Sequence, residues 1–139
     1  MADPRPPRGI VDTSVVIDLD RVDPTALPAE LAISAVTLAE LAAGPHATAD
    51  PAERARRQDL LQRTEAAFEP LPVDAAVARA YGRLYAAVAA AGRKARRRRA
   101  FDLLIAATAL AAELPLYTRN PDDFAELGGL VNVVAVSAE

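Results

Sequence analysis

The chain has 139 residues, enough for one ordinary domain with a sizeable core, and 52% of them are hydrophobic. It has no cysteine, which excludes disulfides and cysteine-based metal sites, and no apolar run reaches the length of a membrane-spanning helix. The formal net charge of −3 gives the whole chain no basic surplus of the kind typical of nucleic-acid-binding proteins. We expect a cytoplasmic protein with no membrane partner.

The N-terminal segment predicts a strand followed by a helix. Residues 1–7 are polar and rich in proline, and we expect a flexible N-terminus rather than a signal peptide. Residues 8–12 predict a short buried strand, and residues 14–22 can form a first helix. The polar residues between strand and helix are suitable helix caps: Asp12, Thr13 and Ser14.

Three helices and two strands are predicted in the middle of the chain. Residues 31–34 predict the strand, and the following helix, capped by Ser34, ends at Gly44-Pro45. A longer polar–apolar helix is expected over about 50–68. Residues 71–73, flanked and interrupted by proline, predict a short strand before a helix that Asp74 caps and Gly92 ends.

The C-terminal third begins with a basic block, RKARRRR at 93–99. An Ala-rich, buried helix is expected over 101–114, followed by a strand at 116–118. Residues 118–124 predict a turn leading into a short helix, and residues 130–136 a last strand. Strands therefore alternate with helices and are continuous apolar runs, which predicts an α/β fold with a parallel sheet in one domain over residues 8–139.

Acidic and amide side chains follow the predicted strands or lie near helix starts. In an open parallel sheet such positions meet at the carboxyl edge of the strands, where ligands bind. We therefore expect a cluster that repels itself unless a cation neutralises it. Carboxylate and amide oxygens suit Mg²⁺ or Mn²⁺, and such a site serves phosphodiester hydrolysis. The expected cluster contains Asp12, Glu40, Asp102, Asn120 and Asp123.

Each member of the cluster also has a structural explanation. Asp12 and Asp102 could be caps or favourable charges near helix starts, and Asn120 and Asp123 could be turn residues. Glu40 is the hardest to explain in this way, because it lies within the apolar segment VTLAELA. The single histidine, His46, is expected on a surface loop, which makes zinc an unsuitable metal.

Four motifs in order resemble the PIN domain of VapC-type toxins: DTSVVIDLD at 12–20, SAVTLAEL at 34–41, FDLLIAATA at 101–109 and TRNPDDF at 118–124. The resemblance implies a single three-layer α/β/α sandwich. It also implies a bacterial Mg²⁺- or Mn²⁺-dependent endoribonuclease, the toxin of a type II toxin–antitoxin pair. It further implies a cognate VapB-like antitoxin, a homodimer, and operator DNA bound only through the antitoxin complex.

The resemblance assigns the family's acidic ligands to Asp12, Glu40 and Asp102. The fourth position stays open between Asn120 and Asp123, with Asp122 as a neighbour that could substitute. Supporting roles fall to Thr13, Ser14 and Thr118. The basic block could hold RNA phosphates through Arg93, Lys94, Arg96, Arg97, Arg98 and Arg99, or it could be a solvated loop or an antitoxin contact. The six aromatic residues are expected to pack in the core rather than to stack on bases.

Four other functions compete with this interpretation. A receiver domain requires paired acids after the first strand and a lysine near the last one, and a haloacid-dehalogenase-type phosphatase requires an Asp at the position of Ser14. Both are disfavoured. A PIN-like RNA- or protein-binding module without catalysis and a housekeeping RNA-processing nuclease remain as alternatives.

Overall fold

The computed structural model describes residues 7–92, 97–127 and 129–138, and within them side chains from residue 99 onward in the segment that follows the first gap. The described residues form one parallel sheet with strand order β2-β1-β3-β4. Its strands are β1 (Arg8–Val11), β2 (Glu30–Ala32), β3 (Leu116–Thr118) and β4 (Val133–Ala135). The parallel sheet confirms the predicted α/β fold. Two of the motifs that the sequence singled out lie at the carboxyl ends of the central strands, β1 and β3.

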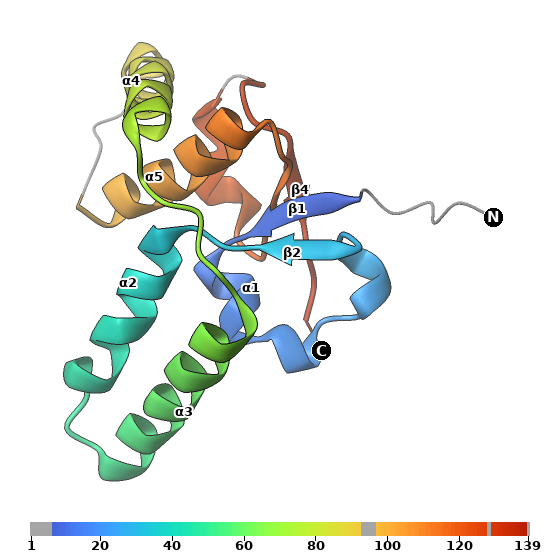
Figure 1. Cartoon of the computed structure of the whole chain (residues 1–139). Coiled ribbons are helices and arrows are strands. Elements are labelled where there is room, and N and C mark those ends of the chain that lie inside the picture. Colours follow the sequence, from blue (N-terminus) through green and yellow to red (C-terminus); the bar gives the residue numbers. More distant parts are fainter. Residues whose placement is uncertain (1–6, 93–96, 128, 139) are drawn as a thin grey trace.

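The helices lie on both faces of the sheet (Figure 1). They are α1 (Thr13–Ile17), α2 (Ala35–Ala43), α3 (Pro51–Ala67), α4 (Ala75–Ala90) and α5 (Arg97–Ala112). Short 3₁₀ segments complete the order: η1 (Leu19–Arg21), η2 (Pro24–Ala26), η3 (Gly44–Ala47) and η4 (Pro121–Leu127). In the described part of the chain, no helix combines the length and apolarity that crossing a membrane requires.

Polar caps explain where four of the helices start. The side chains of Asp12, Ser34, Asp50 and Asp74 each accept a hydrogen bond from a backbone N–H in the first turn of α1, α2, α3 and α4. Such caps satisfy donors that have no partner within the helix. The predicted caps and helix starts at Ser34 and Asp74 are therefore confirmed.

Side chains alternate along the strands between two hydrophobic cores. Ile10 and Leu116 face the core formed with α4 and α5, whereas Val11 and Tyr117 face the core formed with α1 and α3. Alternation with period two is the geometry of a strand covered on both sides. The two cores make the chain a three-layer sandwich, as predicted.

Gly9 allows the two central strands to pack closely. A Cβ atom at this position would lie 2.5 Å from Cε1 of Tyr117 and 3.1 Å from Cγ of Pro28. Real side chains do not approach so closely. The absence of a side chain at Gly9 thus makes room for the Tyr117 ring in the second core.

Several predicted elements differ from the structure. Residues 71–73 do not form a strand, because prolines at 70 and 72 lack the N–H that a ladder needs and only Leu71 pairs, in a single bridge with Ser34. The first helix stops at Ile17 and continues as 3₁₀ turns, and the last strand spans only Val133–Ala135. Helix α5 begins at Arg97 rather than at Phe101, so the basic block runs into the helix.

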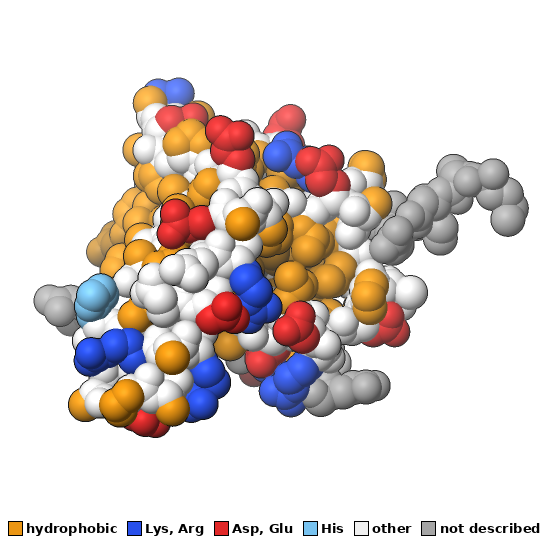
Figure 2. All heavy atoms as spheres, turned by 60° about the horizontal axis from the view of Figure 1, so that its bottom comes forward, with side chains coloured by type: hydrophobic (Ala, Val, Ile, Leu, Met, Phe, Trp, Pro, Cys, Tyr) orange, Lys and Arg blue, Asp and Glu red, His pale blue; other side chains and the backbone are white. Residues whose placement is uncertain are grey.

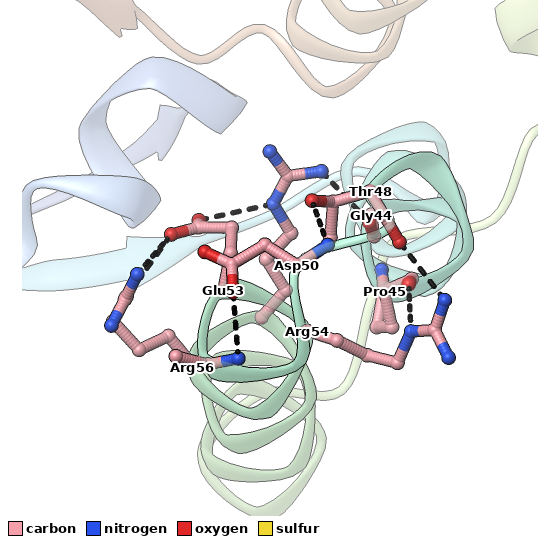
Figure 3. Close-up of polar contacts among 9 residues, drawn as sticks. Gly44, Pro45, Thr48, Asp50, Glu53, Arg54 and Arg56 are labelled. Carbon is pink, nitrogen blue, oxygen red and sulfur yellow. Dashed lines mark hydrogen bonds and ion pairs between the residues drawn. The ribbon is translucent and has the colours of Figure 1, made fainter.

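Helices α2 and α3, with η3 between them, form a helical arm that projects from the sheet (Figure 1). Arginines of α3 hold the tip of this arm together (Figure 3). Arg54 donates to the carbonyl oxygens of Pro45 and Thr48 at 3.1 and 2.9 Å, and Arg57 donates to that of Gly44 at 2.9 Å. These bonds satisfy backbone carbonyls at the C-terminus of α2 and in the η3 turn that follows it.

Candidate active site at the carboxyl edge of the sheet

Asp12 lies at the point where β1 ends and α1 begins. Its Oδ1 accepts hydrogen bonds from the Val15 backbone N–H at 3.2 Å and from the Ser14 hydroxyl at 2.6 Å. The residue is only 5% exposed. The cap role proposed from the sequence is therefore real, and it fixes the carboxylate in one orientation.

The charge of Asp12 has no protein counter-charge in the described part of the chain. None of the ion pairs there involves Asp12 or Glu40. Both hydrogen bonds to Asp12 reach Oδ1, and neither reaches Oδ2. A buried carboxylate is costly unless it is paired with a cation or coordinates a metal. The donor set around Asp12 is therefore suited to a hard cation.

Thr13 connects the Asp12 turn to Glu40 in the helical arm. The Thr13 hydroxyl donates to Glu40 Oε1 at 2.7 Å and lies 3.1 Å from the hydroxyl of Thr37, which is fully buried. Because Thr13 has one hydroxyl hydrogen and a carboxylate only accepts, Thr13 accepts from Thr37 while it donates to Glu40. Adjacent residues of one turn, Thr13 and Ser14, thus orient two carboxylates from different elements.

The segment after β3 is bonded to the same turn. The Arg119 backbone N–H donates to the Ser14 hydroxyl at 3.1 Å, and the Arg119 guanidinium forms an ion pair with Asp18 at the end of α1. Thr118, fully buried, accepts from the Asn120 N–H at 3.0 Å. The side chains of Asn120 and Asp123, which follow this anchored segment, are both exposed and therefore accessible to a ligand.

Asp102 lies in the second turn of α5 rather than in its first turn, because the helix starts at Arg97. It is half-buried. Helix α5 is joined to the start of the helical arm, where the hydroxyls of Ser34 and Thr108 lie 3.2 Å apart in the buried interior. The helix that carries Asp102 therefore crosses the base of the helix that carries Glu40.

The predicted cluster is looser than the sequence suggested. Among the described residues, no three acidic, histidine or cysteine side chains lie close enough to form a ready-made metal cage. Magnesium commonly keeps several waters and is bound through one or two carboxylates together with substrate phosphates. The pair formed by Asp12 and Glu40, which Thr13 connects, fits that pattern better than an all-protein cage, and Asp102 on α5 is a further candidate ligand.

A groove of about 580 Å³ opens beside this pair, between α1, α2 and α3. Its lining carries both acidic and basic side chains. Acidic and basic side chains are also interspersed on the face of the molecule drawn in Figure 2. The lining residues are Thr13, Ile17, Glu40, Leu41, Gly44, Glu53, Arg56, Arg57, Asp59, Leu60 and Arg63. The groove therefore begins at Thr13 and Glu40 and runs along the arginine-bearing face of α3.

The basic block is only partly described. Residues 93–96, which include Arg93, Lys94 and Arg96, lie outside the described residues, and Arg97 and Arg98 begin α5. Arg99 forms an ion pair with Glu126 of η4, and the two side chains are 17% and 13% exposed. Arg99 is thus engaged within the protein, which the charge pattern alone did not predict. The Asp18–Arg119 pair was likewise missed, since nothing in the sequence links positions 101 residues apart.

Comparisons with known proteins give a consistent picture. The family model described as "PIN domain" matches residues 10–130. The chain is 40% identical to ribonuclease VapC5 of Mycobacterium tuberculosis over 131 residues, 92% of this chain and 93% of that protein. Ribonuclease VapC4 of the same organism is 36% identical over 118 residues, 83% of this chain and 88% of that protein.

Solved structures agree with the sequence comparisons. The crystal structure of VapBC-5, from a toxin–antitoxin system of M. tuberculosis, superposes with a TM-score of 0.83 at 41% identity, over 94% of this chain and 100% of that chain. FitAcB of Neisseria gonorrhoeae superposes with a TM-score of 0.70 at 26% identity, over 89% and 94% of the two chains.

Proposed function

This chain belongs to the PIN-domain family and is a VapC-type ribonuclease toxin of a toxin–antitoxin system, and we propose that it cuts RNA with Mg²⁺ or Mn²⁺ held by Asp12, Glu40 and Asp102. The observation that carries the metal proposal is the burial of Asp12 without a protein counter-charge among the described residues. Asp12 Oδ2 accepts neither of the two hydrogen bonds that hold the carboxylate, so it can face a cation.

The metal, when bound, polarises the phosphoryl group and lowers the pKa of a coordinated water. The protein's part is to keep its oxygen ligands ionised and oriented. Ser14 fixes Asp12 and Thr13 fixes Glu40, each through a hydroxyl that donates to the carboxylate. Thr118 supports the segment after β3, where Asp123 or Asn120 completes the ligand set.

We extend the proposal to RNA binding by charge. The cleaved strand approaches along the basic block, whose first members would hold phosphates on either side of the cut. Arg99 contributes less directly, because Glu126 already pairs with it. Binding of this kind is largely independent of sequence, so the RNA is recognised mainly through its backbone and loop geometry.

The proposed partners follow from the relatives. VapBC-5 is described as a toxin–antitoxin system, and we propose that this chain likewise binds a cognate antitoxin and forms a homodimer in the bacterial cytoplasm. The chain has a net negative charge, which does not favour binding to DNA. We therefore propose that operator DNA is bound by the complex with the antitoxin and not by the toxin alone.

Cleavage of RNA by the purified chain tests the proposed chemistry. We expect cleavage in Mg²⁺ or Mn²⁺ and none in EDTA, and we expect Glu40→Gln and Asp102→Asn each to lower the rate at least about 100-fold, the scale of losing a group that stabilises the transition state. Glu65→Gln is the matched control, since Glu65 is an exposed carboxylate of α3 that does not line the groove, and the variant should keep the rate within about twofold of wild type.

Circular dichroism would check that each variant is folded. Cleavage that persists in EDTA, or full activity in both ligand variants, would show that the metal mechanism is wrong. A folded wild-type chain that binds RNA but never cleaves it in Mg²⁺ or Mn²⁺ would instead identify a binding module.

A further inference from the structure

Phe101 is exposed although it lies in a helix whose middle is deeply packed. Its relative exposure is 45%, whereas Leu103 and the stretch from Ile105 to Ala109 are almost completely buried in the same helix, α5. The sequence predicted that the aromatic residues pack in the core, and for Phe101 and Tyr85 this is wrong. A single exposed apolar ring is common on protein surfaces, so the surroundings of Phe101, one residue before Asp102, decide what the ring can bind.

The ring forms one wall of a small hollow against the helical arm. Val36, Ala39 and Ala43 of α2 form the opposite wall, and the volume is about 290 Å³. Glu40 is the one ionisable residue among the described residues that line it. The described part of this lining combines apolar walls with one carboxylate, which accepts a flat, neutral ring more readily than a phosphate.

Glu40 borders two cavities at once. It lines the hollow on the Phe101 side and the long groove on the Thr13 side. A ligand that passes over Glu40 therefore has one part in the groove and its neighbouring part in the hollow. A single-stranded nucleic acid has this geometry, because a base branches from the backbone beside every phosphate.

We propose that the hollow is a nucleobase subsite, in which the base next to the cleaved phosphate stacks on Phe101; this inference rests on the proposed ribonuclease function. Stacking accepts any base, so the subsite contributes affinity and position rather than sequence choice. The small volume suits one ring system, whereas a protein partner would need a larger apolar surface than one phenyl ring and three short aliphatic side chains provide.

The chain contains no tryptophan, which gives a direct probe. Phe101→Trp introduces a single indole whose fluorescence reports stacking by a base. Val73→Trp is the matched control, because Val73 has the same 45% exposure and lies outside the hollow, before α4. Each variant is titrated with a single-stranded oligouridine and with an abasic oligonucleotide of the same length, while anisotropy of the labelled nucleic acid measures binding independently.

We expect oligouridine to quench the indole fluorescence of the Phe101→Trp variant, the abasic strand to bind without quenching it, and the Val73→Trp signal to remain constant. In Mg²⁺, we expect Phe101→Leu to raise KM for oligouridine by roughly 5- to 150-fold, the effect of losing one stacked base, and Phe101→Tyr to restore it. For an abasic substrate, the KM of the same Phe101→Leu variant should equal that of the wild type.

Two results would overturn the subsite. One is an unchanged KM in Phe101→Leu while the wild type cleaves RNA normally, which leaves the proposed function intact. The other is a Phe101→Trp signal that depends on protein concentration without RNA, together with a Phe101→Asp variant that sediments as a smaller species, which would make Phe101 a contact between two copies of the chain. Absence of cleavage by the wild type itself would refute the proposed function instead.

Discussion

Asp12→Asn separates the charge of the buried carboxylate from its structural role. Asparagine caps helices as well as aspartate, and its side-chain oxygen can still accept from the Val15 N–H and the Ser14 hydroxyl. The substitution therefore keeps the start of α1 and replaces the charged Oδ2 atom by a neutral NH2 group at a site that is 5% exposed. The effect on stability should consequently depend on whether a divalent cation is present.

In EDTA we expect Asp12→Asn to raise the free energy of unfolding by at least about 1 kcal/mol, since the variant no longer buries a charge without a counter-charge. In Mg²⁺ the order should reverse. A cation at 100 times its dissociation constant stabilises the wild type by about 2.7 kcal/mol, which corresponds to roughly 10 °C in a domain of this length, and the variant should gain little of this.

Thermal unfolding followed by circular dichroism, with and without Mg²⁺, measures both halves of the prediction. Glu65→Gln serves as the control because it removes an exposed carboxylate of α3 that lies outside the groove, and its response to Mg²⁺ should equal that of the wild type. An equal rise in melting temperature in Asp12→Asn and the wild type would refute the reasoning, since Asp12 would then hold no cation.

Three further predictions concern the framework of the site. Gly9→Ala should lower the free energy of unfolding by about 1–3 kcal/mol in urea titrations, because the new Cβ would lie 2.5 Å from the buried Tyr117 ring; an unchanged midpoint would contradict this. A double-mutant cycle of Asp18→Asn and Arg119→Gln should give a coupling of about 1 kcal/mol, since the two side chains are only 18% and 31% exposed, and strictly additive single variants would refute it. Burial raises the pKa of the Tyr117 phenol. The contribution of the neutral phenol to folding stability is therefore complete below the ordinary pKa of about 10 and is lost as the pH rises through the folded pKa. Above about pH 10, Tyr117→Phe should consequently lose less stability than the wild type does.

The sequence predicted most of the elements because their signals are local. The caps at Ser34 and Asp74 start helices where expected, and the apolar runs before Asp12 and Arg119 form the central strands. The failures have equally local causes. Prolines around Leu71 remove the donors of a strand, and the start of α5 lies within an arginine run that has good helix propensity but no apolar period.

The site was less predictable than the fold because its contacts join distant positions. Motif spacing suggested Asp12 and Glu40, and the structure connects them through Thr13, 27 residues from Glu40. No local pattern shows that Arg119 pairs with Asp18. The exposure of Phe101 was hidden for another reason: α5 is apolar around most of its circumference, so periodicity does not reveal which side faces solvent.

The helical arm has a closed base, and this affects which parts of the chain can change. Where the arm leaves and rejoins the sheet, the Leu71 N–H donates to the Ile33 carbonyl and the Ala35 N–H donates to the Leu71 carbonyl, both at 2.9 Å. The entering and leaving segments therefore hold each other, and Glu40 lies between this base and the tip around Thr48.

An insertion at the tip lengthens a surface turn whose ends are already fixed, and the entropy cost of a longer turn grows only slowly with its length. We expect such chains to tolerate new sequence between η3 and α3 without displacing the carboxylate that lies nearer the sheet. The tip is thus the place where a toxin of this architecture can acquire new recognition surface while its chemistry stays unchanged.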